Sequence, residues 1–114
     1  MTKDPLLQPY QLKHLTLRNR IMTTSHEPAY PEDGMPKDRY RAYHEERAKG
    51  GIALTMTAGS AAVSKDSPPA FNNILAYKDE VVPWIKRMTD GVHEHGTVHP
   101  TNKDVKRKDW VDPA

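Results

Sequence analysis

Residues 43–56 read YHEERAKGGIALTM, and they indicate the fold class more clearly than any other part of the sequence. Its first half is polar and is typical of a solvent-facing helix, which the pair Gly50-Gly51 should end because glycine favours the conformations that follow a helix. Residues 52–57 then form a nearly continuous run of apolar and β-branched side chains. Such a run is typical of a strand that is covered on both faces, as in a parallel sheet. The stretch therefore predicts a helix followed directly by a buried parallel strand.

The residues before this stretch predict a hairpin and a first strand. Leu15 and Leu17 alternate with polar neighbours, which is the period of a half-buried strand, and a turn at Lys13-His14 would complete a short hairpin. Residues 21–25 read IMTTS and are the next strand candidate. The chain thus supplies two strands that a parallel sheet could place side by side.

A loop and a helix should connect these two strands. Residues 28–36 hold three prolines and an Asp-Gly pair. They favour a loop because proline lacks the backbone donor and glycine tolerates positive φ. The helix should begin near Asp38, whose carboxylate can cap the amides of the first turn. Charges of both signs on this helix are typical of a solvated face.

A polar segment and a second helix follow the buried strand. Residues 61–78 are rich in Ser, Asn, Asp and Pro, and we expect a long loop there. A helix should run from about residue 79 to 95, with Pro83 in its first turn and Gly96 after its end. The expected buried face of this helix consists of Val82, Ile85, Met88 or Thr89, and Val92. Strands that alternate with helices predict an α/β protein of parallel βα units with right-handed crossovers.

Residues 99–114 break this alternation. A third buried strand is due after Gly96, but only Thr97-Val98 is strand-like there. The following residues are polar and show no periodicity, which predicts a disordered tail. We therefore expect a folded part over residues 1–98 and a tail over residues 99–114.

The composition excludes several classes of protein. The 114 residues carry 17 Lys and Arg against 15 Asp and Glu, a net charge of +2, and no Cys. The lack of Cys excludes a disulfide scaffold and any Cys-ligated metal, and the small charge does not suggest a nucleic-acid partner. No apolar run reaches the length of a membrane span, and the first residues lack the apolar stretch of a secretory signal. These features predict a soluble cytoplasmic protein with no membrane partner.

Two clusters of polar side chains do not favour a functional site. The sequence His93-Glu94-His95 suggests a metal pair, but residues two apart do not share a helix face, and a helix end facing solvent accounts for them better. The basic residues near position 106 are diluted by acidic neighbours. No phosphate-binding glycine motif is present. We therefore predict no metal site.

The favoured site lies where the two predicted strands end. Thr24, Ser25, His26 and Glu27 follow the first strand, and Gly59 follows the second. Active sites of parallel α/β barrels lie at this end of their strands. Small side chains there let a flat ligand approach the backbone, and His26 can exchange protons near neutral pH. The alternative is that these are ordinary polar loop residues and that Gly59 is a plain turn glycine.

Several motifs together resemble one known family. They are residues 15–21 (LTLRNRI), 33–36 (DGMP) and 43–54 (YHEERAKGGIAL), followed by Trp84 and residues 92–96 (VHEHG). This set resembles the old yellow enzyme family of FMN-dependent NADH:flavin oxidoreductases, from about Asp4 to Val98. The sequence TSHEP at residues 24–28 is most similar to the long branch that includes trimethylamine dehydrogenase, dienoyl-CoA reductase and N-methylproline demethylase-like proteins.

The resemblance implies an eight-stranded (β/α)₈ barrel that binds FMN. It implies that Thr24, Ser25, His26 and Glu27 line the flavin ring, that Gly59 touches it, and that His26 contacts flavin or substrate. A reduced nicotinamide, NAD(P)H, or an N-methylated amine would reduce the FMN, which would pass electrons to a small organic substrate. Glu27 occupies a position that is often Thr or Cys, so a cysteinyl flavin link is excluded there, and Ser25 replaces a frequent Pro.

The resemblance also implies that most of the barrel is missing. The family continues after Val98 with six further strands, and a barrel of this kind needs about 250 residues. We therefore expect the incomplete amino-terminal portion of such a barrel, an entry hairpin plus about two βα units. The fragment should be inactive alone, with unpaired strand edges that favour aggregation. The alternative is a noncatalytic α/β interaction module or a pseudogene remnant.

Overall fold

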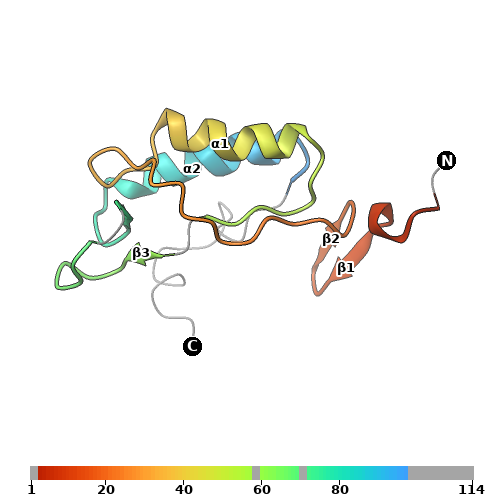
Figure 1. The fold of residues 1–114 in the computed structure, drawn as a ribbon, viewed down its shortest axis with the longest axis horizontal. Helices are drawn as coiled ribbons and strands as arrows, with labels where there is room; N and C mark the ends of the chain where they lie inside the picture. The colour runs from red at the N-terminus through yellow and green to blue at the C-terminus, as the bar shows by residue number, and fades with distance from the viewer. Residues whose placement is uncertain (1–2, 58–59, 70–71, 98–114) are drawn as a thin grey trace.

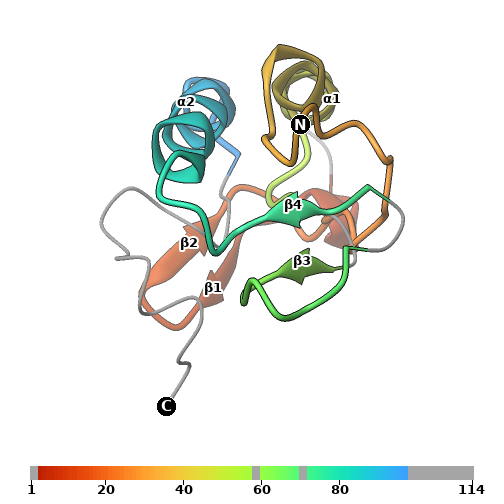
Figure 2. The same ribbon diagram turned by 90° about the vertical axis from the view of Figure 1, so that its left-hand side faces the viewer.

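A computed structural model describes residues 3–57, 60–69 and 72–97 of the chain. Its two long helices, α1 (Asp38–Lys49) and α2 (Val81–His93), lie side by side over a layer of short strands and extended segments (Figures 1 and 2). The short 3₁₀ helix η1 covers Pro5–Leu7. The strands are β1 (Tyr10–Leu12), β2 (Leu15–Leu17), β3 (Ala61–Ala62) and β4 (Ile74–Leu75).

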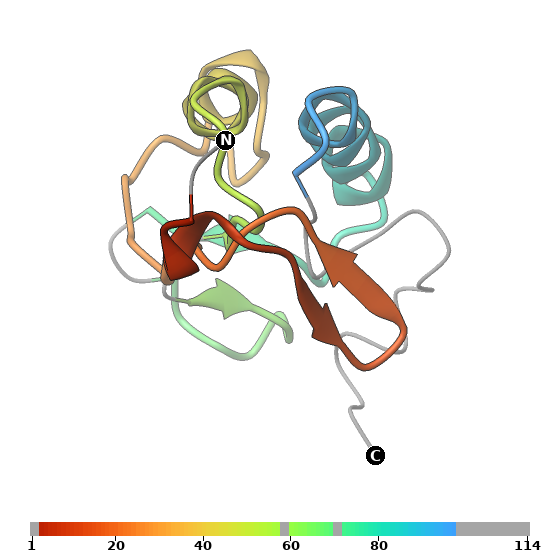
Figure 3. The same cartoon turned by 90° about the vertical axis from the view of Figure 1, so that its right-hand side faces the viewer.

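The predicted hairpin is confirmed. Strands β1 and β2 pair antiparallel, with Tyr10 opposite Leu17 and Leu12 opposite Leu15. Lys13 turns the chain with a φ of 52°. The hairpin lies at one end of the strand layer (Figure 3), and its inner residue Leu17 is buried with Ala53 and Leu54. It therefore covers the end of the layer at which the first strand segment begins.

The two expected parallel strands do lie side by side, although they form one bridge and not a full ladder. Met22 pairs with Leu54 in parallel, and Thr23 donates its amide to the Leu54 carbonyl at 3.0 Å. Among the described residues neither segment has a second strand neighbour, and a ladder that is bonded along one edge only is easily interrupted. The predicted segments are right in position and direction, while their regularity was overestimated.

Three details of the expected elements are wrong. Asp38 does not cap α1: Lys37 is the N-cap residue, and Asp38 pairs instead with Arg87 of α2 at 3.2 Å. The segment 61–78 is not all loop, because it contains β3 and β4, which pair in parallel. Each strand has only two residues, which is too few to show a periodicity in the sequence. Val82 was expected on the buried face of α2 but is 42% exposed, and Val81 occupies the buried position instead.

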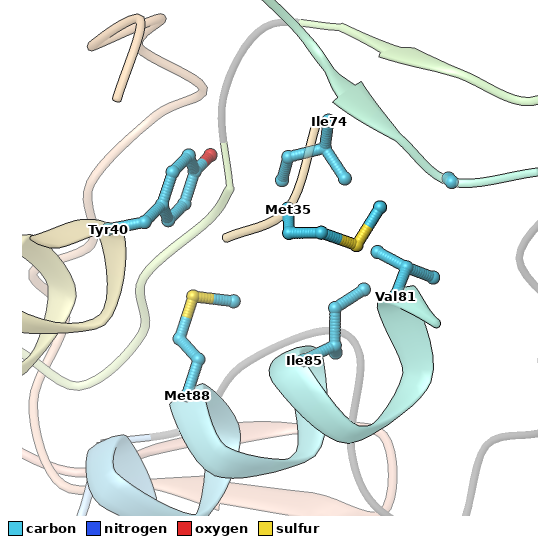
Figure 4. Close-up of a cluster of buried hydrophobic side chains, with 7 residues drawn as sticks. Met35, Tyr40, Ile74, Val81, Ile85 and Met88 are labelled. Atoms are coloured by element: carbon cyan, nitrogen blue, oxygen red, sulfur yellow. The ribbon is translucent and has the colours of Figure 1, made fainter. Parts of the chain in front are cut away.

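The main hydrophobic core lies between the helices and β4 (Figure 4). Helix α2 buries Val81, Ile85 and Met88 on one face, as expected for an amphipathic helix. Tyr40 enters from α1, and Met35 enters from the proline-rich loop. The loop thus contributes to the core, which fixes its position beside the strand ends.

A two-residue turn places Met35 in this core. Glu32 and Met35 exchange backbone hydrogen bonds of 2.9 and 3.0 Å, and Asp33 and Gly34 both have positive φ, 55° and 77°. Two positive φ values define a type I′ turn, for which Asp-Gly is a preferred pair. The Gly34 carbonyl also accepts the amide of Leu75 in β4. The turn therefore joins the loop to the second pair of strands.

Candidate functional site

The segment Thr24–Glu27 continues from the paired strand segment at its carboxyl end. Thr24, Ser25 and His26 are exposed, and Glu27 is half-buried. The Ser25 hydroxyl lies 3.9 Å from Sδ of Met56, which belongs to the neighbouring segment. The structure therefore brings the end of the first segment against the end of the second. Gly59, the other predicted site residue, lies outside the described residues.

Polar contacts hold the loop that follows this segment. Glu27 accepts the amide of Ala29 at 3.4 Å, and the side-chain amide of Asn72 donates to the carbonyls of Ala29 and Pro31 at 3.1 and 2.8 Å. Ala29 has a φ of 58°, a conformation that L-residues adopt only when their surroundings favour it. Asn72 thus ties the loop after Glu27 to the segment before β4.

Two tyrosine rings, each covered by an arginine side chain, tie the same loop to α1. The guanidinium of Arg39 lies 3.9 Å from the Tyr30 ring, and that of Arg47 lies 3.5 Å from the Tyr43 ring. Tyr30 and Tyr43 meet edge to face, with ring centroids 5.8 Å apart. Such contacts contribute roughly 0.5–1 kcal/mol each at exposed sites. The position of the loop is therefore set from two sides.

Beneath the site, three polar side chains from three segments form a buried chain of hydrogen bonds. Thr23 Oγ1 lies 2.9 Å from Thr55 Oγ1, and Thr55 Oγ1 lies 2.7 Å from His44 Nδ1. Thr55 and His44 are 0% and 1% exposed. Burial, together with the smaller effect of the Arg47 charge, lowers the pKa of His44 from 6.5 to about 4. His44 is therefore a neutral imidazole at physiological pH.

Acidification is expected to destabilise the fold through His44. Because the pKa is about 4 in the folded chain and 6.5 in the unfolded chain, the unfolded state binds more protons between these values. Stability is thus complete above the unfolded pKa and falls as the pH drops toward the folded one. The loss of unfolding free energy reaches about 2 kcal/mol at about pH 5.

Urea unfolding as a function of pH measures this effect. The variant His44→Gln should show a flatter pH dependence over the same window, because it removes the titrating imidazole while keeping a polar side chain. An unchanged slope in His44→Gln would show that the acid sensitivity comes from other groups.

Most of the residues that support the site were not predicted from the sequence. Thr55, His44 and Asn72 were not identified from the sequence as site residues. The signal for His44 was its place four residues from both Tyr40 and Ala48, on the buried face of α1. No comparable signal marks Asn72, whose partners lie more than forty residues away.

The exposed segment has the free polar groups that a flat polar ligand needs. The backbone amides of Thr24, Ser25 and His26 make no hydrogen bond to any other described residue. Glu27 Oε2 is buried, and within the described part of the chain it has no hydrogen-bond partner. Buried polar atoms are rarely left unsatisfied. These groups fit a ring that combines an apolar face with polar edges, as FMN does.

Two other classes of site find no support in the described part of the chain. No group of three His, Asp or Glu side chains that could hold a metal ion occurs there. None of the helices described is both long and apolar enough to span a bilayer.

Comparisons with known proteins identify relatives over most of the chain. The sequence profile of the NADH:flavin oxidoreductase / NADH oxidase family matches residues 5–99. A probable N-methylproline demethylase of Rhizobium meliloti (strain 1021) is 80% identical over 98 residues, which are 86% of this chain and 14% of that protein. A multifunctional alkene reductase/demethylase of Caballeronia cordobensis is 53% identical over 95 residues, 83% of this chain and 14% of that protein.

The solved structures agree on the fold. Old yellow enzyme from Pichia sp. AKU4542 superposes with a TM-score of 0.75 at 21% identity, over 83% of this chain and 25% of that chain. The described residues thus have the fold of part of a (β/α)₈ barrel, as predicted, and they form no closed barrel. The chain spans 14% of the length of the curated relatives named above.

Proposed function

This chain belongs to the NADH:flavin oxidoreductase / NADH oxidase family, and from that membership we propose that it forms part of an FMN-dependent oxidoreductase. In this enzyme Thr24–Glu27 would line one side of the flavin ring, and Gly59 would touch the ring from the neighbouring strand. Residues 1–98 would belong to the flavin-binding barrel and residues 99–114 would lie outside it. The observation that carries the proposal is the segment Thr24–Glu27 at the end of a parallel strand pair, where the amides of Thr24, Ser25 and His26 bond to no other residue that the structure describes.

FMN, when bound, would supply the chemistry of this site by taking a hydride from a donor and passing the electrons on. The residues of this chain would bind the flavin ring and orient it. Thr24 and Ser25 are small and exposed, so a flat ring can approach their backbone closely. Glu27 Oε2 offers a buried acceptor for an N–H group. His26 is exposed at the tip of the segment and is our candidate for contact with flavin or substrate.

Glu27 also excludes one way of holding the flavin. A cysteinyl flavin requires a thiol, and the whole chain has no Cys. This part of the site would therefore hold FMN without a cysteinyl link.

We propose N-methylated amines as the hydride donors, with NAD(P)H as the alternative reductant. The support comes from the relatives: besides the N-methylproline demethylase, an N,N-dimethylglycine/sarcosine dehydrogenase of Chromohalobacter salexigens is 40% identical over 98 residues, 84% of this chain and 14% of that protein. Each of these names describes a small N-methylated amino acid.

A chimera tests the proposal. Residues 1–98 of this chain would replace the matching residues of the Rhizobium meliloti relative, so that the rest of the barrel is supplied. We expect the chimera to be purified with about one bound FMN per chain, the stoichiometry of a single site, as read from its visible spectrum. A folded chimera without flavin would contradict the proposal.

Matched variants of the chimera locate the contact. Thr24→Phe places a bulky ring on the proposed flavin wall and should weaken FMN binding by about ten- to a hundredfold, the equivalent of roughly 1–3 kcal/mol of overpacking. Thr16→Phe makes the same change at an exposed threonine of β2. This residue lies in the hairpin that precedes the first strand segment, away from Thr24–Glu27, so the variant should bind FMN as the unmodified chimera does. Equal affinities for the two variants would place the flavin elsewhere.

A further inference from the structure

We propose that Thr23, Thr55 and His44 form a positioning relay, a hydrogen-bonded chain of side chains that holds the start of the Thr24–Glu27 segment against the neighbouring strand segment and α1. The inference rests on the proposed function only in naming a flavin ring as what the positioned segment faces. The relay itself is a property of the chain without any ligand.

The relay joins three parts of the fold that are distant in the sequence. His44 lies on the buried face of α1, Thr55 in the second strand segment, and Thr23 directly before the site. The two links measure 2.9 and 2.7 Å, both within the range of good hydrogen bonds. Both Thr55 and His44 are buried, so water does not compete for their polar atoms. Removing one member would leave the others short of a partner in a dry site, which costs more than a surface bond does.

The hydrogen bonds of the relay have one order that satisfies every hydroxyl. Thr23 Oγ1 also accepts the backbone amide of Met56 at 3.2 Å. If Thr23 then donates to Thr55, and Thr55 donates to Nδ1 of His44, each hydroxyl accepts once and donates once. This order requires a neutral imidazole with its hydrogen on Nε2. Burial, which keeps His44 uncharged, agrees with it.

The relay begins where the backbone ladder between the two segments ends. The Thr23 amide donates to the Leu54 carbonyl, and in a regular parallel ladder the next bond would run from the Met56 amide to the Thr23 carbonyl. The Met56 amide instead donates to the Thr23 hydroxyl. A side chain thus replaces the backbone acceptor at the last step before Thr24. The position of that side chain is fixed in turn by Thr55 and His44.

The consequence is that Thr23, Thr55 and His44 decide how rigidly the wall of the site is held. None of the three is an exposed residue of the wall, so they act through Thr24 and Met56 and are positioning residues. Without the Thr55 hydroxyl, Thr23 can rotate about χ1, and the Met56 amide loses a fixed acceptor.

Amide hydrogen exchange of the ¹⁵N-labelled 114-residue chain, with no flavin present, tests the relay. Thr55→Val removes the hydroxyl and keeps the shape. We expect exchange at the amides of Thr23 and Met56 to become about tenfold faster, as for the loss of one buried hydrogen bond. Thr55→Ser should restore the slow exchange. Thr89→Val is the matched control, because Thr89 is about equally buried and, among the described residues, its hydroxyl donates to the Lys86 carbonyl of its own helix.

Two further measurements test the relay. Thr23→Val and the double variant with Thr55→Val should show strongly non-additive effects on Met56 exchange, since both break the same chain. Imidazole ¹⁵N shifts of His44 should show a hydrogen on Nε2 and none on Nδ1. The relay is overturned if Thr55→Val and Thr89→Val speed exchange at Thr23 and Met56 equally, or if the hydrogen lies on Nδ1. A chimera that lacks flavin would contradict the proposed function but would leave this exchange result unchanged.

Discussion

Replacement of Met88 by alanine is expected to lower the free energy of unfolding by about 2–5 kcal/mol, the range for truncating a fully buried large side chain. Met88 is 0% exposed and lies on α2 facing Tyr40 of α1 and Ile85 of its own helix (Figure 4). Truncation leaves a cavity between the helices, and the surrounding side chains relax only in part. For a small domain this is a large share of its total stability.

Urea unfolding of two further α2 variants controls for this result. Met88→Leu nearly conserves volume and should cost less than about 1.5 kcal/mol. Val82→Ala removes apolar atoms from the exposed face of the same helix and should stay within about 0.5 kcal/mol of the unmodified chain. If Met88→Ala costs no more than Val82→Ala, the helices are not packed as described.

Replacement of Gly34 by alanine should cost about 2–4 kcal/mol, which combines the strain of positive φ with overpacking. Gly34 has a φ of 77°, and a Cβ placed on it would lie 2.5 Å from Cδ1 of Leu75. The Gly34 carbonyl also holds the Leu75 amide at 2.9 Å, so the turn cannot move away without losing that bond. The change therefore disturbs both the turn and β4.

Gly51→Ala is the matched control for this substitution. Gly51 also has positive φ, 104°, but a Cβ there meets nothing within 4 Å. It should cost only the backbone strain, about 1–2 kcal/mol. Thermal unfolding of both variants measures the difference. Equal losses of stability would show that the close approach to Leu75 does not destabilise Gly34→Ala.

The parts of the fold that the sequence predicted correctly depend on local patterns. The alternation of Leu15 and Leu17 predicted the hairpin, and the glycine pair after Lys49 predicted the end of α1. Residues 52–57 were predicted as a parallel neighbour of residues 21–25, and the Met22–Leu54 bridge confirms that pairing. In each case the deciding interactions lie within a few residues or in a single long apolar run.

The features that could not be predicted depend on contacts between distant residues. Strands β3 and β4 are two residues each, too short to show any period. Asp38 was expected to cap α1, but its carboxylate pairs with Arg87. This partner could not be predicted from the sequence because it lies on another helix. The supporting residues of the site are long-range for the same reason: the partners of Asn72 and the link from Thr23 to Thr55 join positions that only the fold brings together.

We propose that Thr24–Glu27 is one wall of a flavin site, and a crystal structure of the flavin-loaded chimera would show whether it is. We expect backbone or side-chain atoms of Thr24–Glu27 to lie within about 4 Å of the isoalloxazine ring, the distance of van der Waals contact. A flavin bound against other elements, with Thr24–Glu27 facing solvent, would contradict it.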